Sequence, residues 1–205
     1  MQGERSENGI FLRGEAAEVP SFSHHNHGED YWTFPIAVRR FSGTFDRLNV
    51  VLPASLLEGM TLNRGDTVEV TGEVRSYNNR TGEGSRLVIT VYARTLEKRE
   101  GEHENRLYLR GALCKPAVLR RTPLGRDICD MMLEVNRRYG RADYLPCIAW
   151  GALARRCARW EVGKRLELEG RLQSRGYVKQ LEEGSEQRVA FEISVMQLSE
   201  AEQEE

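Results

Sequence analysis

The chain has 205 residues, which allows one large domain or two small ones. Its 30 Lys and Arg nearly balance 31 Asp and Glu, and 40% of its residues are hydrophobic, as in soluble globular proteins. No apolar run is long enough to cross a bilayer, and the N-terminus has neither a basic start nor an apolar segment. We therefore expect a cytoplasmic protein without a membrane anchor.

The second half of the chain is more basic than the total suggests. Residues 101–198 carry 18 Lys and Arg against 13 Asp and Glu, and the last seven residues add four acids that mask this excess. Arginine outnumbers lysine 26 to 4, which suits planar contacts with phosphates and bases. A compositional bias of the source genome would give the same ratio, so charge alone does not decide the function.

Sliding the sequence along itself reveals an internal repeat. At an offset of 97 residues, NGIFLRG (8–14) falls on NRLYLRG (105–111). At an offset of 98, GDTVEVTGEVRS (65–76) falls on GKRLELEGRLQS (163–174). The chain therefore contains two copies of one unit of roughly 95 residues. We predict an N-terminal domain at 1–98, a C-terminal domain at 105–198 and an acidic tail at 199–205.

Both copies have the same expected order of elements. An alternating strand comes first, a turn-rich stretch follows, then two strands, a short helix and two more strands. The expected strands are 10–14, 31–40, 48–52, 67–77 and 85–96, and in the second copy 107–111, 128–138, 144–150, 165–177 and 187–198. The expected helices are 54–60 and 152–160, which would plug one end of each barrel. This order predicts an all-β protein of two tandem five-stranded OB-fold barrels, each with one short helix between strands 3 and 4.

The third strand of the second copy alternates strictly in side-chain character. Tyr144, Pro146, Ile148 and Trp150 are expected on one face, and Leu145, Cys147 and Ala149 on the other. Aromatic rings on an exposed sheet face, close to arginines, are typical of a platform on which bases stack. The alternative is that Tyr144 and Trp150 are core aromatics.

Cysteine and histidine give no metal signature. The cysteines form no CxxC pair and sit in apolar surroundings, which favours buried, reduced thiols: Cys114, Cys129, Cys147 and Cys157. His24, His25 and His27 lie together in the first turn-rich stretch, and three histidines can hold a metal. No carboxylate or cysteine completes a preformed site, so we expect an exposed loop tip, no metal and no cofactor.

The second copy resembles the bacterial single-stranded DNA-binding protein family over 105–198. The resemblance is carried by N-x-L-x-L-x-G (105–111), T-P-x-G (122–125), L-E-V-N-R-R-Y (133–139), D-Y-L-P (143–146), A-W-G-x-L-A (149–154) and E-G-R-L-Q-S-R-x-Y (169–177). The first copy matches only through the repeat. The whole chain thus resembles a tandem, two-barrel member of that family.

The resemblance implies base stacking by Tyr144, Trp150 and Tyr177, with Tyr139 as a further candidate in the preceding hairpin. The candidates for phosphate contacts are Arg137, Arg138, Arg141, Arg171 and Arg175; their alternative is solvated surface charge. Binding through phosphates would be salt-dependent because it releases counterions.

The first copy departs from this pattern. Arg47 stands at the position of Tyr144, and Pro53 at that of Trp150. Phe41, Phe45 and Tyr77 offer a different platform. Two interpretations stay open: this barrel binds nucleic acid with another geometry, or it serves as a scaffold for pairing.

No phosphate loop, nucleophile motif or acid–base pair is present, so we expect a binding protein and not an enzyme. The predicted function is sequence-tolerant binding of single-stranded DNA in replication, recombination or repair. The family usually works with four barrels, which implies a homodimer. Replication or repair proteins are possible partners, although the chain lacks the apolar-tipped acidic tail that recruits them in the family. The alternatives are an adaptor in replication restart or a mobile element, and an OB module for RNA.

Overall fold

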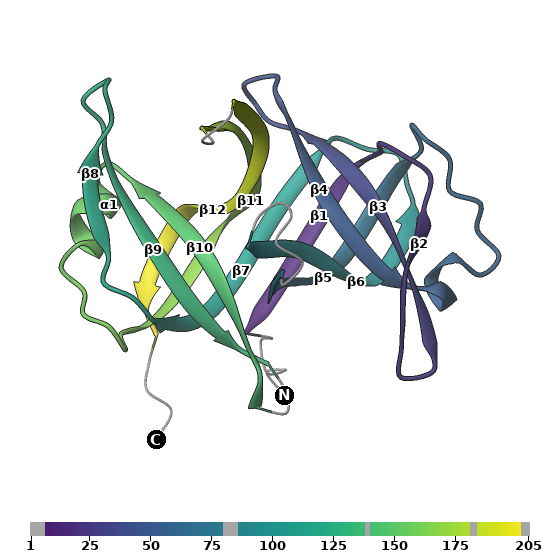
Figure 1. The fold of residues 1–205 in the computed structure, drawn as a ribbon, viewed down its shortest axis with the longest axis horizontal. Coiled ribbons are helices and arrows are strands. Elements are labelled where there is room, and N and C mark those ends of the chain that lie inside the picture. Colours follow the sequence, from purple (N-terminus) through teal and green to yellow (C-terminus); the bar gives the residue numbers. More distant parts are fainter. Residues whose placement is uncertain (1–6, 80–85, 138–139, 181–183, 202–205) are drawn as a thin grey trace. The chain divides into compact units, whose positions relative to one another are not determined.

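A computed structural model gives the fold and describes residues 7–79, 86–137, 140–180 and 184–201 (Figure 1). The chain forms two compact units. The C-terminal unit consists of 1–9, 107–172 and 191–205, and the N-terminal unit of 10–106 and 173–190. The domain boundaries expected from the repeat, 1–98 and 105–198, stay predictions.

The N-terminal barrel is a sheet of six strands with one short 3-10 helix. Its elements are β1 (Asn8–Ala16), β2 (Ser21–Asn26), β3 (Glu29–Arg39), β4 (Phe45–Pro53), η1 (Ala54–Leu57), β5 (Thr67–Asn78) and β6 (Leu87–Lys98). Neighbouring strands follow the order β2-β3-β4-β6-β5-β1, and β1 closes the barrel by also pairing with β3. In this barrel, β4 and β6 pair in parallel, and the other described strand pairs are antiparallel.

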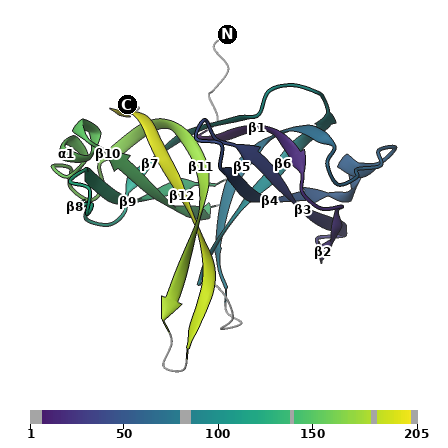
Figure 2. The ribbon, with the colours of Figure 1, turned by 90° about the horizontal axis from the view of Figure 1, so that it is seen from above.

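The C-terminal barrel repeats this topology. Its elements are β7 (Glu104–Leu113), β8 (Val118–Arg121), β9 (Asp127–Asn136), β10 (Ala142–Trp150), α1 (Ala152–Cys157), β11 (Arg165–Gln180) and β12 (Ser185–Glu200). The order is β8-β9-β10-β12-β11-β7, and pairing of β7 with β9 closes the barrel. Beyond the barrel, β11 and β12 continue as a long ribbon (Figure 2). The all-β fold of two tandem OB barrels is confirmed.

Alternating apolar side chains fill each barrel, as the period of two predicts. On β4, Leu48, Val50 and Leu52 are fully buried. On β10, Leu145, Cys147 and Ala149 form the corresponding inner face. Ile148 is buried as well, although its register placed it with the outward residues. It lies opposite Asp130 on β9 and Ser194 on β12, in the interior of the sheet and not at its edge.

Glycine makes the closing contact of both barrels possible. A Cβ on Gly14 would lie 2.4 Å from the backbone oxygen of Ala37, and a Cβ on Gly111 would lie 2.5 Å from that of Glu134. Both distances are far below van der Waals contact, so no larger residue fits without moving the strands. The two glycines are 97 residues apart, which shows that the repeat conserves the seam of the barrel.

Each barrel carries one strand more than predicted, because the turn-rich stretches hold β2 and β8. Every side chain of β2 and of β8 is exposed, so neither strand has the alternation that marks a half-buried strand. The β2–β3 hairpin turns through His27 and Gly28, whose φ angles are +48° and +80°. Two successive positive φ values are the requirement of a type I′ hairpin turn.

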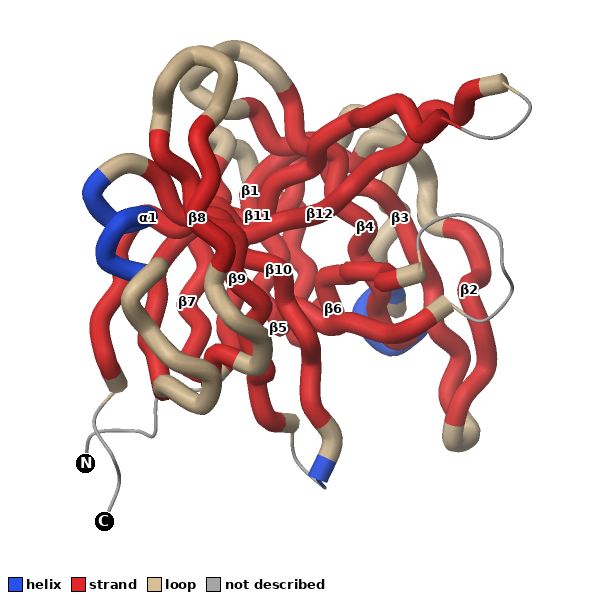
Figure 3. The backbone as a smooth tube through the Cα atoms, turned by 60° about the vertical axis from the view of Figure 1, so that its left-hand side comes forward, coloured by secondary structure: helices blue, strands red, loops and turns tan. Residues whose placement is uncertain are grey.

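Both helices are shorter than predicted (Figure 3). Gly59, with φ +70°, follows η1 and prevents a longer helix there. After α1, Arg159 and Trp160 donate backbone hydrogen bonds to the residues three positions before them, so the chain continues in tight turns. Cys157 is buried, while Leu153, Trp160 and the η1 leucines are half-buried. The helix therefore covers the end of the barrel more fully in the C-terminal copy.

Three cysteines are buried and Cys114 is half-buried, and all four are free thiols. Burial raises the pKa of Cys157 to about 12, and it also raises the pKa of Cys147 and Cys129. Thiols that stay protonated are poor nucleophiles. Among the described residues, no helix is both long and apolar enough to cross a lipid bilayer.

Candidate nucleic-acid interface

Strand β10 presents two aromatic rings to solvent. Tyr144 is 44% exposed and Trp150 is 42% exposed, while the residues between them supply the core. Side chains six residues apart share a face of a strand, so both rings lie on the outer side of β10, roughly 20 Å apart. A base can stack only on a ring face that it can reach, and both rings meet that condition.

The corner beside Trp150 is held by a polar network. Gly151, at φ +59°, ends β10 and leads into α1, and its N–H donates to the backbone oxygen of Asp127 at 2.8 Å. The Asp127 carboxylate accepts hydrogen bonds from Arg155 (2.8 Å) and Arg121 (3.0 Å). These bonds, that from Arg155 first, lower the pKa of Asp127 below its usual value. Helix, β8 and β9 are thereby tied together at the end of β10 that carries Trp150.

Arg137 supports the hairpin before β10. Its Nε donates to Asp143 at 2.6 Å and its Nη2 binds the other carboxylate oxygen. The Asp143 side chain is fully buried, and that of Arg137 is 23% exposed. Phosphate binding by Arg137 would compete with this pair, so the structure gives the residue a role in holding Asp143.

The remaining predicted residues of the second copy lie in three places. Arg141 is exposed just before β10, and Arg171 is half-buried on β11. Tyr177 and Arg175 lie on the outer part of β11, within the N-terminal unit. Arg138 and Tyr139 lie outside the described residues.

The outer parts of β11 and β12, which we call the outer hairpin, also hold Arg188. This residue was not among those expected from the sequence. Its Nε donates to Glu186 at 2.9 Å. Hydrogen bonds to Glu186 and, to a smaller extent, to Tyr177 raise the pKa of Arg188. No sequence pattern pointed to Arg188, because 187–198 carried only the alternation of a strand.

In the first copy, Phe41 (94% exposed), Phe45 (53%) and Tyr77 (56%) all face solvent. Phe41 belongs to the β3–β4 connection and Phe45 begins β4, whereas Tyr77 is near the end of β5. The Phe45 ring meets His103 edge-on, with centroids 5.9 Å apart. His103 Nδ1 accepts a hydrogen bond from the backbone N–H of Arg39 at 2.8 Å. The segment between the two repeats therefore packs beside Phe45 at His103.

An Arg–Asp pair equivalent to Arg137–Asp143 occurs in the first copy. Asp46, with a side chain 3% exposed, accepts hydrogen bonds from Arg40 Nε (2.8 Å) and from the backbone N–H of Ser174 (2.7 Å). Arg40 also donates to the Ser174 carbonyl at 2.8 Å. This cluster fixes the outer part of β11 within the N-terminal unit.

The histidines of β2 are engaged with their own hairpin. The His24 ring stacks on Tyr31, and His25 Nδ1 lies 2.7 Å from Asp30 Oδ1. Within the described ranges, no group of three or more His, Cys, Asp or Glu side chains could hold a metal ion.

The model of the Single-strand binding protein family matches residues 104–199. This range is the C-terminal barrel, β7 to β12, with its exposed Tyr144 and Trp150. Residues 104–199 belong to the single-strand binding protein family. The resemblance seen in the sequence motifs is confirmed.

Curated relatives and solved structures are also similar to this chain. Single-stranded DNA-binding protein 3 of Streptococcus agalactiae is 32% identical over 83 residues, which are 37% of this chain and 60% of that protein. Single-stranded DNA-binding protein 1 of the same species is 31% identical over 83 residues, 37% of this chain and 51% of its own length. The chain therefore spans between half and two thirds of these curated relatives.

The wild-type single-stranded DNA binding protein from Thermus aquaticus matches with a TM-score of 0.80 and 22% identity, covering 98% of this chain and 96% of that one. A deletion mutant of the same protein matches with a TM-score of 0.79. At this identity the likeness concerns the fold. It extends over both barrels, whereas the single-strand binding family model covers the second alone.

Proposed function

We propose that the protein binds single-stranded DNA without sequence preference and protects it during replication, recombination or repair. One observation carries the proposal: a barrel of the single-strand binding family exposes Tyr144 and Trp150 on one face of β10. Every base has a π-face, so stacking on these rings tolerates any sequence and contributes about 1–3 kcal/mol per base. The protein acts by binding and not by catalysis.

Arginines supply the sequence-independent part of the affinity. Arg141 and Arg175 are exposed, and the outer hairpin adds Tyr177 with its partner Arg188. Arg171 completes the set from β11. Each phosphate neutralised on a single strand adds about 0.7 to the slope of log K against log salt. Affinity should therefore fall steeply between 50 mM and 500 mM NaCl.

Two chains would present four barrels, and we propose a homodimer as the working form. Its partners would be other proteins that act on exposed single strands, and its compartment the cytoplasm, where the bacterial chromosome lies. Sedimentation equilibrium tests the assembly, because a dimer has twice the 23.5 kDa of the chain. A monomeric mass at micromolar concentration would contradict it.

A fluorescence titration tests the function itself. We expect dT oligomers of about 20–35 nucleotides to bind tightly and to quench tryptophan emission, at several nucleotides per barrel. Duplex DNA and hairpin RNA of equal length serve as competitors. Competition by hairpin RNA as strong as that by dT would favour an RNA-binding module, and absence of any binding would favour a protein adaptor.

A further inference from the structure

The first copy lacks an aromatic at the position of Trp150, yet aromatic rings lie around that position. Pro53 stands 97 residues before Trp150, and its cross-strand partner on β3 is Tyr31. Residues directly opposite each other in an antiparallel pair have side chains on the same face. Tyr31 therefore lies beside the place that Trp150 occupies in the other copy.

Two further rings extend this position into a platform. Tyr92 on β6 lies 6.1 Å from Tyr31, centroid to centroid. The exposed His24 ring on β2 stacks on Tyr31 at 4.8 Å and is nearly parallel to it, at 6°. Three strands thus contribute one ring each, and all three belong to the N-terminal unit.

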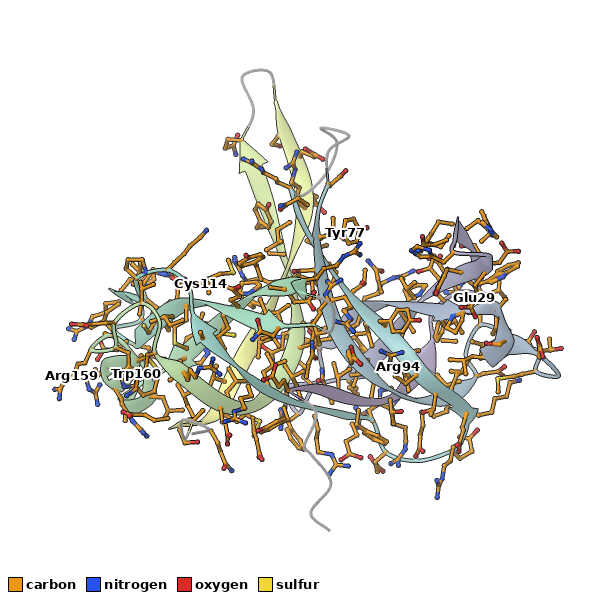
Figure 4. All side chains as sticks on the ribbon, turned by 90° about the horizontal axis from the view of Figure 1, so that it is seen from below. Glu29, Tyr77, Arg94, Cys114, Arg159 and Trp160 are labelled. Atoms are coloured by element: carbon orange, nitrogen blue, oxygen red, sulfur yellow. The ribbon has the colours of Figure 1, made fainter. Side chains whose placement is uncertain are left out.

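The rings are held in place before any ligand arrives. The Tyr31 hydroxyl donates to Glu29 Oε2 at 3.2 Å, and its hydrogen bond with Tyr92, together with burial, raises the pKa of Tyr31. The Arg94 guanidinium lies 4.9 Å from the centre of the Tyr92 ring. Figure 4 labels Arg94 on β6 and Glu29 at the start of β3. Rings that are already ordered lose little entropy when a base stacks on them.

Charges around the platform favour a base over a bare phosphate. Glu73 accepts hydrogen bonds from Arg94 at 2.9 Å and also pairs with Arg75. Asp30 is engaged with His25, and Glu29 with Tyr31. These carboxylates would repel a phosphate placed directly over the rings. A flat, uncharged base can lie there while its backbone passes on the side of Arg94.

We propose that His24, Tyr31 and Tyr92 form a second base-stacking site, in which the first copy replaces the ring at the Trp150 position with rings from three neighbouring strands. The site rests on the proposed function, since it takes an unpaired base of the same single strand. It adds to the platform of Phe41, Phe45 and Tyr77, which lies elsewhere on the barrel.

Oligonucleotides of two lengths distinguish binding at the second copy from binding at both copies. A dT oligomer of about 8–10 nucleotides occupies one barrel, and we expect it to choose the copy with Trp150. Its affinity should be equal in wild type, His24→Ala and Tyr31→Leu. For dT of about 30 nucleotides, the same variants should bind roughly fivefold to tenfold more weakly. Tyr31→Leu retains apolar packing, and the exposed His24 can be truncated without disturbing the core.

Phe22→Ala is the matched control. Phe22 is an exposed aromatic on the same hairpin, but it pairs with Trp32, one residue along β3 and therefore on the opposite face of the ribbon. It should leave binding of both oligomers unchanged. If Phe22→Ala weakens the long oligomer as much as His24→Ala does, the shape of the hairpin matters and not the rings, and the site is refuted.

Photocrosslinking gives an independent readout on the intact protein. A 30-nucleotide dT with 5-iodo-deoxyuridine at successive positions should crosslink to peptides that contain His24, Tyr31 or Tyr92. Suppose that Trp150→Ala weakens binding, that no crosslink forms to peptides with these rings, and that the hairpin variants bind dT as wild type does. The second site is then refuted and the proposed function stands. If wild-type protein does not bind dT at all, both fall.

Discussion

The two copies keep the same barrel and differ at the corner where the third strand meets the helix. In the C-terminal copy, Asp127 ties β9 to Arg155 of α1. At the offset of 97 residues, Asp30 is the equivalent of Asp127, but it binds His25. The equivalent of Arg155 is Glu58, an acidic residue. Gly59 then occupies the position of Arg156 and stops the helix after one turn.

This difference separates what the fold requires from what the site requires. The seam glycines and the buried Arg–Asp pairs occur in both copies, because each barrel needs them to close. The corner and its aromatics diverge, because they lie at the surface. A surface that changes while its support is conserved is what we expect where two copies share a strand of DNA but contact it differently.

The buried Arg–Asp pairs provide the largest expected effect. Asp143→Ala removes one member of a largely buried ion pair, so the free energy of unfolding should fall by about 3 kcal/mol. Asp46→Ala should cost a similar amount because it also removes the acceptor of the Ser174 N–H. Urea unfolding of both variants measures the two losses.

The matched control for both variants is Asp130→Ala. Asp130 also pairs with an arginine, Arg120, but its side chain is 44% exposed, so its loss should cost less than about 1 kcal/mol. Equal losses for all three variants would mean that the buried pairs do not support the barrels.

Trp150→Ala tests the site of the second copy. It should weaken binding of long dT by clearly more than about tenfold, and so by more than any single substitution in the first copy, because stacking contributes about 1–3 kcal/mol per base. Trp160→Phe is the control, since that indole lies under Arg156 beyond α1. Unchanged affinity in both Trp150→Ala and Tyr144→Ala would show that the site is assigned to the wrong face.

Arg155→Gln tests the corner that only the second copy has. Because Arg155 and Arg121 lower the pKa of Asp127, the ionised carboxylate stabilises the fold above the usual carboxyl range. That contribution is lost as the pH falls through the lowered pKa. The variant should therefore melt slightly below wild type at pH 7, and the gap should close below about pH 4. A gap that widens on acidification would reverse the assignment.

The smallest expected effect concerns the thiols, all of which lie in the second copy. Burial raises the pKa of three of them, and burial and Glu134 raise that of Cys114. Iodoacetamide at pH 8 should therefore modify the native protein slowly and all four thiols rapidly after unfolding in urea. Mass spectrometry counts the adducts, and rapid labelling of Cys147 in the native state would contradict the buried core.

Much of the fold could be predicted from the sequence because the repeat and the period of two reinforce each other. The inner face of β10 follows directly from alternation, and the glycine at each seam follows from the offset of 97. Strands β2 and β8 could not be found this way, since a ribbon exposed on both faces leaves no pattern of burial. The helix ends were overestimated for a similar reason: apolar spacing continues into the tight turns after α1.

The candidate site was predicted in part. Exposure of Tyr144 and Trp150 followed from the inward-facing residues between them, and their role in binding DNA stays a prediction. The ion pair of Arg137 was not visible, because a sequence does not tell whether an arginine meets a phosphate or a buried carboxylate. The rings of His24, Tyr31 and Tyr92 were not grouped in advance, because β2 has no alternation that reveals it as a strand and Tyr92 on β6 is distant in sequence from the β2–β3 hairpin.

The hydrogen bond between Ser174 and Asp46 bears on how this protein can be taken apart. A fragment that stops at residue 98 retains all six strands of the first copy, yet it loses a donor to a carboxylate that water hardly reaches. Expressed by itself, such a half should be prone to misfolding, because the Asp46 carboxylate keeps Arg40 but loses the Ser174 donor. The gene contains two repeats, but the polypeptide does not divide into two independent modules at the same point.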